Sequence, residues 1–159
     1  MGVRYSSRMI GRLVVLQLCM MLAWSGSVSA DLGAGLAGIE ADTLALMGVD
    51  RTTALLQYDV HEIDAAQGLT VREFISRGGT VFALSWSGPV PPNLQGLLGR
   101  YYNGYAAAVA ALKQPGLNRS MHIALADLVV ESGGHLRAYS GRAYLPALIP
   151  AGVSVADLR

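Results

Sequence analysis

Two glycine pairs, placed on either side of one helical stretch, constrain the fold of this chain more than any other feature. Each pair separates two β-rich runs: residues 71–77 and 80–86 flank Gly78-Gly79, and residues 128–132 and 135–140 flank Gly133-Gly134. A two-residue hairpin turn needs positive φ at its central positions, which glycine adopts without strain. The sequence therefore predicts two β-hairpins, in which Gly78, Gly79, Gly133 and Gly134 have structural roles.

One long helix is predicted between the hairpins, at about residues 94–113. Apolar residues recur there at helical spacing and would form one stripe facing the sheet. Asn93 is a suitable N-cap, and Pro91-Pro92 would stop any helix before it. The members of the apolar stripe are Leu94, Leu97, Leu98, Tyr101, Tyr105, Ala108 and Leu112.

The order of these segments predicts an α+β domain. Ahead of the first hairpin, Leu56, Tyr58 and Val60 alternate with polar residues, as in a strand with one wet face. The order β-β-β-α-β-β then predicts an antiparallel sheet of about five strands with the long helix packed on one face. We expect this single domain to span residues 54–159, after a loose lead-in at 31–53 that contains a short helix.

The N-terminus predicts export. Three arginines precede an apolar run at residues 13–24, and small residues then lead to Ala30. A basic region, a short apolar region and a small-residue cleavage site are typical of a secretory signal peptide. We expect residues 1–30 to be removed by a cut after Ala30. The apolar run is also shorter than the roughly 20 residues of a spanning helix. We therefore expect no stable membrane span after cleavage.

The composition of the chain after this cut excludes some classes of function. The leader takes three of the 12 basic residues and none of the 11 acidic ones, which leaves a formal charge of −2. That balance does not fit a nucleic-acid partner. The single cysteine, Cys19, leaves with the leader, so the mature protein would have no disulfide and no thiol nucleophile. We expect a periplasmic or secreted protein.

Several ordered segments resemble a known family. They are residues 70–74, 79–83 with 86–89, 97–102, 128–135 and 141–146. Together they resemble the secreted proteobacterial proteins of domain-of-unknown-function family 2844. The resemblance covers nearly all of the mature chain and implies export from a Gram-negative cell. It implies no activity, so no catalytic residue is carried over.

The residues themselves give no convincing catalytic or metal site. Serine, histidine and aspartate are all present, but no G-x-S-x-G elbow or H-E-x-x-H motif occurs. We therefore expect no cofactor, no metal and no catalytic residue. Two alternatives stay open: a small hydrolase whose Ser, His and Asp are assembled across loops, and a structural subunit that pairs through a strand edge.

Four residues are candidates for binding a ligand or an unknown envelope partner: Tyr102, Tyr144, Arg142 and His135. Tyr102 lies off the apolar stripe of the helix and is expected to face solvent. His135 would open the second strand of its hairpin. The prediction for function is thus a non-catalytic binding or assembly component of the envelope.

Two further residues of the first hairpin are expected to be structural. A two-residue turn would pair Ile75 with Phe82, Glu73 with Leu84 and Val71 with Trp86 on the apolar face. Glu73 would then be a carboxylate among apolar residues, where an unpaired charge is costly. We expect Arg142 or Arg100 to reach it, and we expect Trp86 to pack under the helix.

Overall fold

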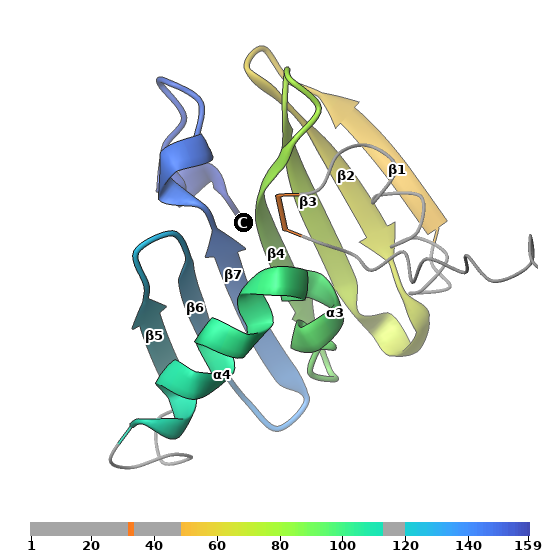
Figure 1. The fold of residues 1–159 in the computed structure, drawn as a ribbon. Coiled ribbons are helices and arrows are strands. Elements are labelled where there is room, and N and C mark those ends of the chain that lie inside the picture. The colour runs from red at the N-terminus through yellow and green to blue at the C-terminus, as the bar shows by residue number, and fades with distance from the viewer. Residues whose placement is uncertain (1–31, 34–48, 113–119) are drawn as a thin grey trace, which may run out of the picture.

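The computed structural model describes residues 32–33, 49–112 and 120–159. In these residues one antiparallel sheet has the strand order β1-β2-β3-β4-β7-β6-β5 (Figure 1). The seven strands are β1 (Val49–Ala54), β2 (Tyr58–Asp64), β3 (Thr70–Ser76), β4 (Val81–Gly88), β5 (Ser120–Ala124), β6 (Val129–His135) and β7 (Ala138–Tyr144). The α+β antiparallel class is confirmed, but the predicted five strands lack the two edge strands, β1 and β5.

The helical stretch follows the break after β4. It consists of α3 (Leu94–Leu98), the 3₁₀ turn η2 (Gly99–Tyr101) and α4 (Tyr102–Ala110), which together cross one face of the sheet (Figure 1). The side-chain oxygen of Asn93 accepts a hydrogen bond from the Gly96 amide at 3.3 Å and so caps α3. Gly99 has a φ of 47°, which accounts for the 3₁₀ turn inside the predicted single helix.

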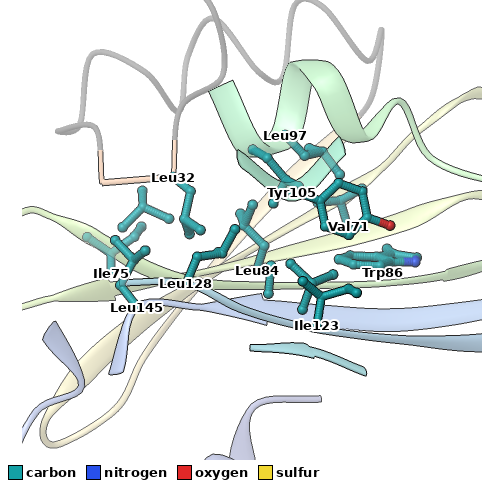
Figure 2. Packing of buried hydrophobic residues seen from close by; sticks show 14 of the residues in the cluster. Leu32, Val71, Ile75, Leu84, Trp86, Leu97, Tyr105, Ile123, Leu128 and Leu145 are labelled. Atoms are coloured by element: carbon teal, nitrogen blue, oxygen red, sulfur yellow. The ribbon is translucent and has the colours of Figure 1, made fainter. Parts of the chain in front are cut away.

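The helix face of the sheet, defined as the face that α3 and α4 cover, carries the larger core (Figure 2). Trp86, Val71 and Leu84 from the central strands pack there with Leu97, Leu98 and Tyr105 of the helices. Leu32 joins the same core at 1% exposure, and the Gly33 amide donates to the Val81 carbonyl at 2.9 Å. The described residues of the lead-in at 31–53 therefore take part in the domain, since β1 also begins within it.

We call the opposite face the groove face. The C-terminal segment, residues 145–159, covers part of it. This segment contains two 3₁₀ turns, η3 (Pro146–Leu148) and η4 (Val155–Asp157). Its Leu158 is completely buried against Phe74, Phe82 and Ala83. The ring centroids of Phe74 and Phe82 lie 6.4 Å apart, and each lies 5.9 Å from that of Tyr58. The sheet thus has a small aromatic core on this face as well.

The turn of the first hairpin is longer than predicted. Its loop is Arg77-Gly78-Gly79, with the Ser76 amide bonded to the Thr80 carbonyl at 2.9 Å, and Gly79 has a φ of 78°. A three-residue loop that ends in a left-handed glycine is a common hairpin form. Ile75 consequently pairs with Val81 rather than with Phe82.

A bulge then restores the predicted register. The pairing shifts between Phe74 and Ile75, after which Glu73 pairs with Leu84 and Val71 with Trp86, as the sequence predicts. The bulge turns Phe82 toward the groove face, where it packs against Phe74. The expectation that Phe82 lies on the helix face is therefore wrong, because it assumed an uninterrupted alternation along β4.

The second hairpin does not turn at its glycine pair. His135 pairs with Ala138, so the two-residue turn is Leu136-Arg137, and Arg137 has a φ of 66°. Gly133 and Gly134 lie inside β6 instead. A Cβ atom at Gly134 would lie 2.9 Å from the Tyr139 Cα, so the close approach of β7 requires glycine at this strand position.

Three predictions fall on residues outside the described ones. These are the signal peptide at 1–30, its cut after Ala30, and the short helix within 39–47. Among the residues that the structure describes, none of the helices has the length and apolar character needed to cross a membrane.

Candidate functional site

Residues directly opposite one another across the groove face form a continuous row over the whole sheet. One residue of each strand belongs to this row, because the antiparallel registers of all neighbouring strands coincide there. We call it the charged row. In the order of the strands it contains Arg51, Glu62, Arg72, Ser85, Arg142, Glu131 and His122.

The charged row is organised by ion pairs around its centre. The Arg72 Nε atom donates to the Glu62 carboxylate at 2.6 Å, on the side away from Ser85. On the other side, the Arg142 Nε atom donates to Oε2 of Glu131 at 2.6 Å. The other carboxylate oxygen of Glu131 lies 3.3 Å from Nδ1 of His122. Each of the two central arginines is thus oriented by a carboxylate on its outer neighbour strand.

A second row, of mostly hydroxyl side chains, runs beside the charged row. We call it the hydroxyl row; it contains Thr70, Ser87, Ser140, Gly133 and Ser120. The members of the two rows on β3, β4, β7, β6 and β5 line a groove of about 750 Å³, and Arg51 and Glu62 lie outside it. This volume falls within the range typical of small-molecule sites, roughly 300 to 1,000 Å³. Serines near the middle of the sheet leave space between the longer side chains around them.

The C-terminal segment forms one wall of the groove. Leu158 and Arg159 line it, and Leu158 is fixed in the aromatic core of the groove face. Arg142 donates from Nη1 to the Val155 carbonyl at 2.6 Å, and Arg72 donates from Nη1 to the Arg159 carbonyl at 3.1 Å. The same two arginines therefore hold the wall in place. Nη2 of Arg142 also lies 2.6 Å from Oε2 of Glu131, so all three nitrogens of that guanidinium have partners, whereas Arg72 has no bond from Nη2 within the described residues.

Tyr144 lies beside the groove, two residues after Arg142 on β7. Its ring packs with the aromatic core of the groove face. Burial raises the pKa of Tyr144 above its ordinary value of 10.0, nearby Glu131 raises it further, and Arg142 acts in the opposite direction. The hydroxyl, which is neutral at neutral pH in any case, therefore keeps its proton further into the alkaline range.

The four candidate binding residues do not converge. Arg142 is a central part of the groove and Tyr144 is its neighbour. Tyr102 is half-buried against the core of the helix face, with its ring centroid 6.3 Å from that of Tyr105, rather than facing solvent freely. His135 is exposed at the end of β6, and its Nδ1 lies 3.4 Å from the Leu136 carbonyl. These last two residues are not among those that line the groove.

Glu73 is completely buried on the helix face, opposite His61 of β2 and Leu84 of β4. The proposal that Arg142 reaches it is wrong, because Arg142 points to the groove face and binds Glu131. Arg100 has its guanidinium 4.9 Å from the ring centre of Tyr101. A pairing of Arg100 with Glu73 stays a prediction, and a double-mutant cycle on the two residues would measure it.

The described part of the chain gives no geometric support to a Ser/His/Asp site. Three histidine contacts within it are those of His61 with the Thr52 hydroxyl at 3.2 Å, His122 with Glu131, and His135 with a backbone carbonyl. None of these three contacts reaches a serine. A search of the same residues for three clustered His, Cys, Asp or Glu side chains that could hold a metal finds no such group.

Most groove residues were not singled out as a site from the sequence. Arg72, Ser85 and Glu131 come from three strands, and nothing in their sequence spacing shows that they meet. A signal was nevertheless present: Thr70 and Arg72, like Ser85 and Ser87, alternate with buried apolar residues, which predicts a polar face of the sheet. What the sequence could not provide is the strand order that brings β7 next to β4.

The fold and the groove together define a small α+β protein with a polar groove on one sheet face and a helix-covered core on the other. The chain matches the family described as protein of unknown function (DUF2844) over residues 28–158. It therefore belongs to that family, so the family resemblance found in the sequence is confirmed, and export from a Gram-negative cell stays a prediction. Curated proteins and solved structures give no match.

Proposed function

We propose that the mature protein is an exported, non-catalytic component of a Gram-negative cell envelope that binds a small polar ligand in the groove. The observation that carries this proposal is the alignment of two polar rows over one groove of about 750 Å³. Export is supported by the basic, apolar and small-residue parts of the N-terminal 30 residues.

The groove has the properties expected of a preformed site. Its central arginines are fixed by carboxylates and by backbone carbonyls, so little side-chain freedom would be lost when a ligand binds. Ser85, at 6% exposure, forms the floor between them. Rigid charged groups beside small hydroxyl residues favour binding of a polar molecule over packing of an apolar one.

Pairing through a strand edge is less well supported. At β1, Arg51 forms ion pairs with Glu62 at 3.7 Å and with Asp64 at 2.5 Å. Charged residues on an edge strand oppose the addition of another strand. The other edge, β5, has only five residues. A hydrolase would need a serine activated by a histidine, and the described histidine contacts do not provide one.

Native mass spectrometry of protein recovered from the periplasm would test this proposal. Ser87 is exposed on the floor of the groove, so Ser87→Trp should fill the groove without entering the core. Ala138→Trp is a matched control, because Ala138 is also an exposed strand residue but does not line the groove.

We expect a bound small molecule on the wild-type protein and on Ala138→Trp, and a clear loss of that species on Ser87→Trp. Equal thermal stability of the two variants would show that the substitution acts on binding. The proposal fails if no bound molecule is found on the wild type, or if all three proteins carry it equally.

A further inference from the structure

We infer that the groove holds the carboxylate group of its ligand between Arg72 and Arg142, above Ser85. This inference rests on the proposed function, because it names the ligand chemistry of the same groove. The two arginines lie on β3 and β7, each paired with Ser85 of β4. Strands two apart in a sheet are about 10 Å apart, which leaves room for a small anion between two long side chains.

The charge of the lining favours an anion. Three arginines line the groove, Arg72, Arg142 and Arg159, and only one carboxylate does so, that of Glu131. Among these side chains, with Glu62, which binds Arg72 from outside the groove, also counted, one positive charge is left over. A singly charged carboxylate balances that excess more closely than a phosphate group, which carries about −1.5 to −2 at neutral pH.

The donor geometry also fits a carboxylate. A guanidinium has five N–H donors in a planar fork that matches the two oxygens of a carboxylate. Within the described residues, Arg72 uses Nε for Glu62 and Nη1 for the main-chain oxygen of Arg159, so its Nη2 edge has no bond among them. Each Nη atom of Arg142 already has one partner, Val155 or Glu131, and keeps one further N–H, so Arg72 is the main donor. Ser87 and Ser140, directly opposite one another in the hydroxyl row, can donate to the same ligand.

Arg51 provides a control for the structural roles of the two groove arginines. Arg51 also belongs to the charged row and also binds Glu62, yet it lies at the sheet edge outside the groove. It is therefore a matched control for the removal of an arginine that pairs with a carboxylate. Arg72 is the better groove residue to replace, because its side chain is 42% exposed against 19% for Arg142.

Titration calorimetry with two pairs of probes would test the inference. One pair is galacturonate and its uncharged methyl ester; the other is trialanine and its C-terminal amide. The two pairs separate an acidic sugar from a peptide terminus as the source of the carboxylate. Each probe is titrated into the wild-type mature protein, Arg72→Met, Arg51→Met and Ser85→Ala, with inorganic phosphate as a further probe.

We expect at least one acid to bind, with its neutral counterpart about tenfold weaker or more. Arg72→Met should weaken binding of that acid by a similar factor, Ser85→Ala should weaken it less, and Arg51→Met should leave it unchanged. The same melting temperature for Arg72→Met and Arg51→Met would exclude unfolding as the cause.

The inference is overturned if neither acid binds, if acid and neutral probe bind equally, or if phosphate binds as tightly as the better acid. It is also overturned if Arg51→Met weakens binding as much as Arg72→Met. The arginines would then affect binding by stabilising the sheet and not by contacting the ligand. If the Ser87→Trp experiment still shows a displaced molecule in any of these cases, the proposed function stands and only the carboxylate assignment falls.

Discussion

Gly141 of β7 leaves room for the indole ring of Trp86 on the helix face, between two residues that line the groove. It pairs with Trp86, and a Cβ atom at this position would collide with the indole ring and lie 2.6 Å from the Glu131 carbonyl. Glycine therefore lets the indole lie directly over β7 on the helix face. Its neighbours Ser140 and Arg142 point the other way and line the groove.

Trp86 is expected to contribute to stability as a core residue. It is 4% exposed and packs with Leu97, Leu98 and Tyr105. Trp86→Ala should lower the free energy of unfolding by about 3–5 kcal/mol, because the cavity would be only partly refilled. Thermal and urea unfolding would measure the change, with Leu136→Ala, at an 82% exposed position, as the control. An unchanged midpoint for Trp86→Ala would contradict the core role.

Tyr105 should make the protein less stable in alkali. Burial, and to a lesser extent nearby Tyr102, raise the pKa of Tyr105 above 10.0 in the folded protein. Since the folded pKa lies above the unfolded one, the stabilising contribution is complete below pH 10 and is lost as the pH rises through the folded value.

Urea unfolding of the wild type and of Tyr105→Phe between pH 8 and 11 would measure this effect. The free energy of unfolding should fall less steeply above pH 10 in Tyr105→Phe, because phenylalanine has no proton to lose. Parallel curves for the two proteins over this range would contradict the prediction.

At the scale of the elements, the sequence predicts best where a local signal and the tertiary structure agree. The central strands β3, β4, β6 and β7 were located by their β-rich runs. β1 was not, because Val49–Ala54 has no apolar alternation, and β5 is short. The pair Gly78-Gly79 predicted a turn at about the right place, but the pair Gly133-Gly134 did not. Glycine is needed at Gly134 because β7 approaches it closely, and this contact is not visible in the sequence.

The N-cap of α3 offers a test at this scale. Asn93 accepts the Gly96 amide, and the helix that it begins carries Leu97 and Leu98 into the core. Asn93→Ala should lower the free energy of unfolding by about 1 kcal/mol. Asn93→Asp keeps the acceptor and should unfold close to the wild type. If chemical denaturation shows the same loss for both variants, the side-chain acceptor is not what stabilises the helix start.

At the scale of the whole molecule, the fold class followed from the sequence but the groove did not. Arg142 was selected on its own, whereas its partners Glu131 and Val155 lie on β6 and in the C-terminal segment. The true register of the β6–β7 hairpin brings Glu131 to Arg142, and the path of the C-terminal segment brings Val155 there. The polar character of the face was predictable, and its arrangement around two arginines was not.

The start of the mature chain can be tested directly. Cleavage after Ala30 would leave Leu32 as the second residue, and Leu32 is buried in the core of the helix face. We therefore expect intact-mass analysis of the exported protein to give a chain that begins at Asp31. Ala30→Glu should block processing. A mature species that retains Trp24, or one that lacks Leu32, would contradict this cleavage site.

The bulge at Phe82 has a consequence for how the protein can vary. It lies between the β3–β4 turn and the two rows of the groove, and it compensates for the extra residue in that turn. Gain or loss of one residue in the turn can be absorbed at the bulge, so that Arg72 and Ser85 keep their partners. The turn could therefore change in length at this end of the sheet while the groove at the other end keeps its residues in register.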